Sequence, residues 1–315
     1  MPVGFLSSGQ REHYGRFTGE PTPDDLTRYF HLDEFDLGLI SQKRGQHNRL
    51  GFAVQLGTLR YLGTFQDDPL DIPASVLQAL TRQLCIDSTE GVQAYRAGEQ
   101  RWLHAAEIRA QYGYVEITEH RIGLRLTRWL YALCWTGTDR PSVLFERAST
   151  WLITQKVLLP GCTTLERYVS RLRGRVEMRL WKLLTQGISM TQQAKLQALL
   201  EVPEGSRKSQ LDRLRTGPVM SSSTSLTLAL LRLNSVRELG IKLPATTRIP
   251  VTRIAALARF AGAAKVNAIV RLPNPRRLAT LVAFAHCLEA SAQDDALDVL
   301  EGVLRDLFGG AAKAE

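Results

Sequence analysis

Four arginines recur at every fourth position between residues 167 and 179. They are Arg167, Arg171, Arg175 and Arg179, and Arg173 lies among them. On a helix, this spacing places the side chains along one slowly winding stripe. Guanidinium groups bind the phosphates and base edges of duplex DNA, so the stripe predicts a DNA-contacting helix. The alternative is a solvated face with internal ion pairs, for which Glu177 is the only partner within this stretch.

A turn and a helix-capping pattern come directly before the stripe. Pro160-Gly161 predicts a tight turn, and Thr163 with Glu166 predicts a capping box. Apolar residues at helical spacing predict helices over 142–155 and 164–184. Two helices joined in this way predict a helix-turn-helix whose second helix reads the DNA. The candidate contacts at the start of that helix are Thr163 and Thr164.

A second candidate cluster opens another expected helix, over 46–61. Its members are Lys43, Arg44, Gln46, His47, Asn48 and Arg49. The first turn of a recognition helix is where base edges are read, and Asn, Gln and Arg have the geometry to read them. Since the surrounding segment is slightly acidic, the alternative of a solvated helix start is equally open.

The third candidate is a long basic segment, residues 205–277, which holds 14 Lys and Arg against two acidic residues. Almost no aromatic residues interleave the charges, which argues against stacking on single-stranded bases and favours contact with duplex phosphates. An expected helix over 206–215 carries the first four candidates. The candidates in this segment are Arg207, Lys208, Arg213, Arg215, Arg248 and Arg253.

No pattern in the chain predicts catalysis. The phosphate-binding GxxxxGK[ST], the nucleophile GxSxG and the zinc HExxH motifs are all absent from the sequence. The four cysteines are isolated, and the six histidines stand in unrelated contexts. Asp294, Asp295 and Asp298 share one expected helix, whereas a two-metal site needs carboxylates from separate elements. We therefore expect no enzyme, no cofactor and no metal. An independent nuclease would need a metal site that the sequence does not suggest.

The elements that must position these residues are helical throughout. Helical periodicity dominates and strand alternation is scarce, so the predicted fold is all-α, with small helix-turn-helix-like modules followed by a helical scaffold segment. Breaks predict three regions: 1–86, 87–186 and 187–315. The other expected helices cover 23–30, 33–44, 74–84, 94–112, 120–134, 190–200, 222–239, 251–271 (broken at Gly262), 275–290 and 294–308.

Composition places the chain among ordinary globular proteins. Hydrophobic residues make up 44% and charged residues 23%, with a net charge of +9 and an isoelectric point near 9.6. A basic balance favours polyanionic partners. No apolar run approaches the roughly 20 residues that span a bilayer, and the opening residues lack the pattern of a secretory signal. We therefore expect a cytoplasmic protein without a membrane partner.

Several long stretches resemble one protein family. They include the opening MPVGFLSSGQREHYGRF, the YFHLD of residues 29–33 and, above all, RLGFAVQLGTLRYLGTF at 49–65. The turn LLPGCTTLER at 158–167 and RRLATLVAFA at 276–285, which leads into AQDDALD at 292–298, are similar as well. Together they resemble the N-terminal DNA-binding region of the Tn-three (TnpA) family of replicative transposases, along the whole chain.

The resemblance implies sequence-specific binding of double-stranded DNA at the terminal inverted repeats of a transposon, in a bacterial, nucleoid-associated protein. It also implies a longer C-terminal region with an RNase H-like fold and a DDE metal triad, through which a homodimer would form. No residue of this chain can be matched to that triad, so we expect end recognition without catalysis. The alternative is a helical protein-interaction module that regulates a full-length transposase.

Overall fold

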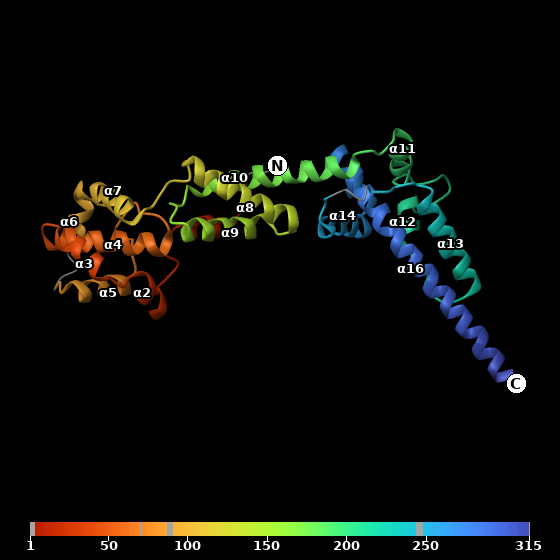
Figure 1. Ribbon diagram of the computed structural model, residues 1–315, viewed down its shortest axis with the longest axis horizontal. Helices are drawn as coiled ribbons and strands as arrows, with labels where there is room; N and C mark the ends of the chain where they lie inside the picture. The colour runs from red at the N-terminus through yellow and green to blue at the C-terminus, as the bar shows by residue number, and fades with distance from the viewer. Residues whose placement is uncertain (1–3, 70, 87–90, 244–247, 315) are drawn as a thin grey trace. The chain divides into compact units, whose positions relative to one another are not determined.

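The computed structural model describes residues 4–69, 71–86, 91–243 and 248–314 (Figure 1). These residues form sixteen α-helices and no β-strand, which confirms the all-α prediction. The only strand-like pairing among them is an isolated bridge between Val115 and Val157. None of the described helices is long and apolar enough to cross a membrane.

Packing divides the chain into two compact units. The first contains residues 1–130 and 139–172, and the second contains residues 131–138 and 173–315. The division into three regions, with boundaries after residues 86 and 186, stays a prediction. The first eight helices are α1 (Ser8–His13), α2 (Pro23–Tyr29), α3 (Glu34–Ser41), α4 (Gln46–Leu62), α5 (Ala74–Leu84), α6 (Gly91–Ala97), α7 (Gln100–Tyr112) and α8 (His120–Thr136).

The remaining helices follow in chain order. They are α9 (Pro141–Thr154), α10 (Cys162–Thr185), α11 (Met190–Ala198), α12 (Gln210–Arg215), α13 (Ser223–Arg237), α14 (Val251–Ala263), α15 (Val266–Val270) and α16 (Asn274–Ala314). Local capping explains several starts. Ser7, Thr22, Asp33 and Ser189 each form a capping box with the residue three positions later.

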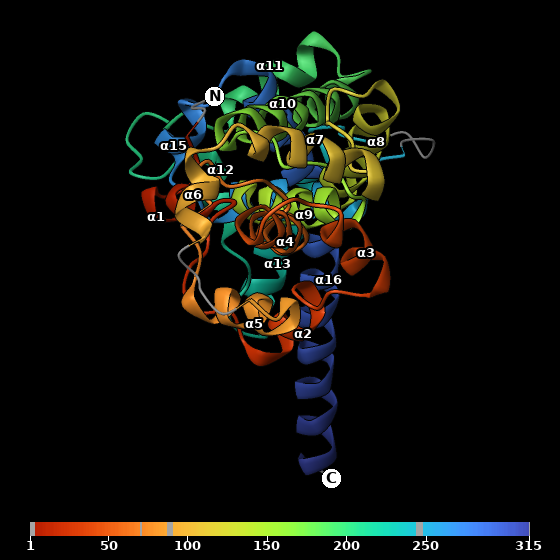
Figure 2. The ribbon, with the colours of Figure 1, turned by 90° about the vertical axis from the view of Figure 1, so that its left-hand side faces the viewer.

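Helix α4 is the centre of the first unit, and α2, α3, α5, α6 and α7 pack against it (Figure 2). Two glycines allow this close packing. A Cβ atom at Gly51 would lie 2.3 Å from the ring of Tyr95, and one at Gly57 would lie 2.4 Å from the ring of Phe30. A larger residue at either position would push a buried ring away from the core.

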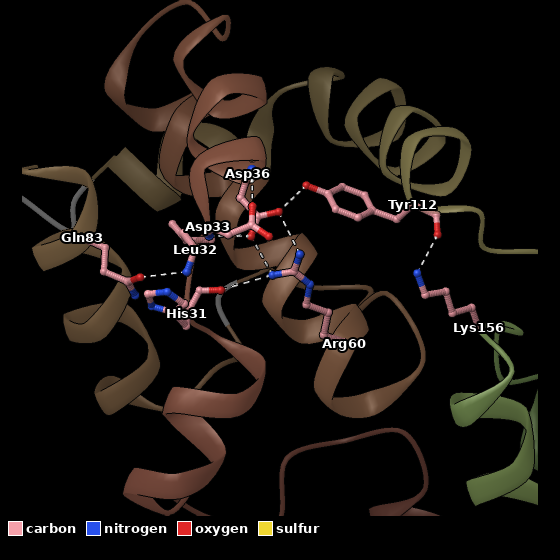
Figure 3. A network of polar contacts seen from close by, with 8 residues as sticks. All are labelled: His31, Leu32, Asp33, Asp36, Arg60, Gln83, Tyr112 and Lys156. Atoms are coloured by element: carbon pink, nitrogen blue, oxygen red, sulfur yellow. Dashed lines mark hydrogen bonds and ion pairs between the residues drawn. The ribbon is translucent and has the colours of Figure 1, made fainter.

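A buried carboxylate ties three of these helices together (Figure 3). Asp36 of α3 is fully buried and accepts two hydrogen bonds of 2.8 Å from Arg60 of α4. The hydroxyl of Tyr112, at the end of α7, donates a third at 2.6 Å. Burial alone would raise the pKa of Asp36, but these hydrogen bonds and the charge of Arg60 outweigh it and hold that pKa below its usual value.

A buried histidine predicts that the stability of the first unit falls in mild acid. His104 shares a 2.9 Å hydrogen bond with Tyr95 and stacks against its ring. Burial, and then the charge of Lys43, lower the pKa of His104. Below pH ~6.5 the unfolded chain therefore takes up a proton that the folded chain does not, at a cost of up to about 1.4 kcal/mol per pH unit.

We expect the free energy of unfolding to fall between pH 7 and pH 5.5, and His104→Phe to flatten that slope. Urea denaturation at several pH values measures both. An equally steep slope in the variant would show that other groups cause the pH dependence.

The second unit is built around α16, which packs against α11, α13 and α14. Its buried residues between 278 and 288 join the core cluster that also includes Leu196 of α11, Val236 of α13 and Ile254 of α14. We expected two helices in this part of the chain, over 275–290 and 294–308, and that prediction was wrong. Ala292 and Ala296 are buried at and beside the expected break, so the core-facing side of the helix continues without interruption.

Three other expected elements need correction. The helix predicted over 94–112 is two helices, separated at Gly98, a residue that weakens helices. The break predicted at Gly262 lies instead at Ala264, whose carbonyl accepts a 2.8 Å hydrogen bond from Arg215. The helix predicted over 206–215 is only Gln210–Arg215, because the Ser209 side chain caps the Asp212 amide and starts the helix there.

Candidate nucleic-acid interface

One face of α10 carries a set of exposed residues, most of them basic. Successive helical residues are about 100° apart, so positions 163 to 182 that share this face can be identified from their spacing and exposure. We call this face the α10 arc. Its exposed members are Thr163, Thr164, Arg167, Arg171, Arg175, Met178, Arg179 and Lys182. The arc thus collects four predicted arginines and one lysine on a single side of one helix.

Both acidic residues of α10 point away from the arc. Glu166 is fully buried, and its Oε1 accepts hydrogen bonds from the backbone amides of Phe5 (2.8 Å) and Leu6 (3.1 Å) and from Arg11 (2.9 Å). Glu177 is also buried and pairs with Arg173 at 3.1 Å. The arc therefore contains no carboxylate that could compete with a phosphate for its guanidinium groups.

These contacts correct one local prediction and refine another. The capping box of Thr163 with Glu166 was wrong: α10 begins at Cys162, so Thr163 lies inside the helix. The Glu166 side chain is instead bound by the amino-terminal segment. Arg173 remains a predicted DNA contact, but in the structure it is half-buried and paired with Glu177 on the other side of the helix.

The start of α10 is anchored from three places in the first unit. The amide of Leu158 donates to the carbonyl of Val115 at 2.9 Å, and the amide of Leu159 donates to the carbonyl of Gly63 at the same distance. The Tyr14 hydroxyl donates to the carbonyl of Pro160 at 3.0 Å. Hydrogen bonds to its backbone therefore hold the connection between α9 and α10 in place, and they fix where α10 begins.

Arg179 is the one arc arginine with side-chain partners that the structure describes. Within the second unit, its guanidinium lies 5.5 Å from the ring centroid of Trp135 and donates to the Tyr131 hydroxyl at 3.2 Å. Arg167, Arg171 and Arg175 have no side-chain partner among the described residues. Their charges are thus available to a ligand, while Arg179 is held in a fixed orientation.

The cluster at residues 43–49 is largely used inside the first unit. Lys43 forms a 2.5 Å ion pair with Glu107. Arg49 donates to the carbonyls of Lys43 (3.0 Å) and Ser41 (3.3 Å), at the end of α3. Asn48 donates to the carbonyl of Arg44 at 2.8 Å. The side chains of this cluster without a hydrogen bond or ion pair among the described residues are Arg44, Gln46 and His47.

The candidates in the basic segment, residues 205–277, likewise include some side chains that are bonded inside their own unit and some that are exposed. Arg215 donates to the carbonyls of Ala261 and Ala264 and pairs with Asp212. Arg253 is half-buried and donates to the carbonyl of Gly137 at 3.0 Å. These two arginines therefore stabilise contacts inside the second unit.

Four of the predicted contacts in this basic segment, residues 205–277, are exposed. Arg213, one of them, donates to Ser206 at 3.0 Å, and Arg207 and Lys208 precede α12 rather than lie on it. The exposed candidates are Arg207, Lys208, Arg213 and Arg248.

Sequence reasoning missed two sets of basic residues. Lys182 follows Arg179 by three positions and completes the α10 arc. Arg121, Arg125 and Arg128 recur at spacings of four and three on α8. The helical period that found the α10 stripe would have found both sets. Among the described residues, no group of three or more His, Cys, Asp or Glu side chains could hold a metal ion.

Comparisons with known proteins match the chain to one family model and to several transposases. The family described as "Domain of unknown function (DUF4158)" matches residues 5–172. The chain is 42% identical over 314 residues to the transposase for transposon gamma-delta of Escherichia coli K12, which covers 99% of this chain and 31% of that protein.

Other relatives are more distant but align along nearly the same length. Identity is 29% over 290 residues to the transposase for transposon Tn501 of Pseudomonas aeruginosa, covering 91% of this chain and 29% of the relative. Identity is 28% over 301 residues to the transposase for transposon Tn1546 of Enterococcus faecium, covering 93% of this chain and 30% of the relative. The chain thus spans about 30% of the length of these relatives. It belongs to the DUF4158 family and corresponds to the N-terminal part of the Tn-three family transposases.

Proposed function

We propose that this chain binds double-stranded DNA at the terminal inverted repeats of a transposon and that the α10 arc is its principal contact surface. The observation that carries the proposal is the arc itself: five exposed basic side chains on one helix, with both carboxylates of that helix buried and paired elsewhere. The proposal assigns DNA binding, and no chemical step, to the described residues.

The chemistry of the arc favours a duplex over a single strand. Proteins that bind single strands stack the bases on exposed aromatic rings. The two aromatic residues of α10, Tyr168 and Trp181, are both half-buried, and the Tyr168 hydroxyl bonds to Thr127 and to the carbonyl of Gly123. Trp135, which lies under Arg179, is partly buried as well. Arginines at helical spacing suit the phosphates and guanine edges of a major groove, which is about 12 Å wide.

We further propose that α9 and α10 act as a helix-turn-helix with α10 as the reading helix. Residues 155–161 join the two helices, and their backbone is anchored to Val115 and Gly63. Two other regions would add contacts through side chains that are exposed or, for His47, half-buried. These are Arg44, Gln46 and His47 at the start of α4, and Arg207, Lys208, Arg213 and Arg248 in the second unit.

A protein-interaction module that regulates a full-length transposase is the second candidate. It is favoured by exposed apolar side chains on the last turns of α16, which include Leu304, Leu307 and Phe308, each between 43% and 72% exposed. Exposed apolar side chains that cluster on a surface often mark a protein partner. This candidate predicts equal affinity for any duplex.

The two candidates separate in a fluorescence anisotropy titration. A labelled terminal-repeat duplex and a scrambled duplex of the same length and composition are titrated with the chain at several salt concentrations. We expect tighter binding of the terminal repeat, with an affinity that falls steeply as salt rises because each phosphate contact releases counterions. Equal, weak binding of both duplexes would favour the protein-interaction module.

A further inference from the structure

Helix α8 carries a second basic face. Arg121, Arg125 and Arg128 are exposed and lie within about 60° of one another around the helix. The helix contains no acidic residue from His120 to Thr136. Its buried side chains Ile122, Leu126 and Leu130 occupy the opposite side. The three arginines therefore face solvent without a carboxylate on their own helix.

This face lies next to the α10 arc within the first unit. Tyr168, on α10 between Arg167 and Arg171, bonds through its hydroxyl to the Thr127 hydroxyl and, at 3.2 Å, to the carbonyl of Gly123. Thr127 and Gly123 lie on the side of α8 between its buried stripe and its arginines, as their half-buried state indicates. The contact thus joins the edge of one basic face to the edge of the other.

The three α8 arginines differ in what holds them. Arg125 donates to Gln155 at 2.6 Å and lies 5.8 Å from the ring centroid of Trp151, which stacks on Trp129. Arg125 is therefore directed toward α9. Arg121 and Arg128 have no side-chain partner among the described residues, so their charges are free for a ligand.

We propose that Arg121 and Arg128 bind backbone phosphates of the same duplex whose groove the α10 arc enters. Packed helices have axes about 8–10 Å apart, and the major groove is about 12 Å wide between its phosphate strands. A helix packed beside a groove-reading helix therefore reaches the flanking backbone. This inference rests on the proposed function. In it, α8 contacts the DNA backbone, which is the same for every sequence, and α10 contacts the groove.

Phosphate contacts and base contacts have different signatures. A phosphate contact strengthens binding to every duplex and adds about 0.9 to the slope of log affinity against log salt. A base contact strengthens binding to the correct sequence alone. The test variant is Arg121→Gln with Arg128→Gln, and the control is Arg28→Gln with Arg82→Gln. The control removes the same charge from exposed positions on α2 and α5 of the same unit.

We expect the α8 variant to bind both the terminal-repeat duplex and the scrambled duplex about ten-fold more weakly than the wild-type chain does, so the ratio of the two affinities stays unchanged. The slope of its log affinity against log salt should be smaller by about two. The control should bind like the wild-type chain. Thermal denaturation checks that all three proteins fold equally well, which is expected because the four substituted side chains are exposed.

Two results would overturn the inference. If the α8 variant binds like the control, α8 does not contact phosphates, although the proposed function stands as long as the wild-type chain prefers the terminal repeat. If the variant loses preference for the terminal repeat while keeping its salt slope, the two arginines read bases instead. A wild-type chain with no preference would contradict the proposed function itself, independently of α8.

Discussion

Replacing Arg171 and Arg175 with alanine is expected to weaken binding of a terminal-repeat duplex by at least about 30-fold. Both side chains are exposed near the middle of the α10 arc, and neither has a partner among the described residues. A well-placed arginine contact contributes about 1–3 kcal/mol. Two contacts at the lower end give about 2 kcal/mol, and about 1.4 kcal/mol is tenfold in affinity. Fluorescence anisotropy measures the change.

Arg28→Ala with Arg82→Ala provides the charge-matched control. It removes two positive charges from exposed positions on α2 and α5 rather than from the arc. We expect its DNA affinity to stay within about threefold of wild type, the scale of general charge effects on binding. The α10 variant should unfold at the wild-type temperature, because exposed substitutions change stability by about 0.5 kcal/mol or less. An α10 variant that binds normally would remove α10 from the interface.

Asp36→Ala is expected to produce the largest loss of stability in the first unit, about 3–5 kcal/mol. Removing one partner of a buried ion pair leaves the other charge without compensation. Here it leaves Arg60 unpaired, and it also removes the acceptor of the Tyr112 hydroxyl (Figure 3). Urea denaturation followed by circular dichroism measures the loss.

The pH dependence of the same site gives an independent check. Because the pKa of Asp36 is lower in the folded chain than in the unfolded chain, its carboxylate stabilises the fold above pH ~4. That stability is lost as pH falls through the lower, folded value. Asp36→Ala should therefore lose less stability in acid than wild type does. Asp24→Asn, an exposed change on α2, should behave like wild type in both respects. Equal losses in the two variants would show that the network contributes little.

Local sequence signals predicted most helices because capping and glycine act within a few residues. Residues 74–84 were predicted as a helix, and α5 has those bounds. Gly63 ends α4 in the left-handed conformation with φ of 75°, which glycine adopts readily. The long α16 was predicted as two helices because its continuity depends on burial against α13, which a local pattern does not contain.

The candidate interface was predictable in part for the same reason. The spacing of the arginines on α10 predicts which of them share one face of the helix, because helical periodicity depends only on neighbouring residues. Which charges are free is a long-range property: Glu166 is bound by residues 155 to 161 positions earlier, and Lys43 by Glu107. Arg215 and Arg253 looked like DNA contacts in the sequence, yet both donate to backbone carbonyls inside their own unit. Charge alone does not separate a structural arginine from a free one.

The most direct test is a hydroxyl-radical footprint of the chain on a duplex that carries a transposon's terminal inverted repeat. We expect the wild-type chain to protect a discrete stretch within the repeat, and we expect the Arg171→Ala, Arg175→Ala variant to lose that protection at the same concentration. Uniform weak protection along the repeat and its flanking DNA, the same for both proteins, would contradict the proposed function.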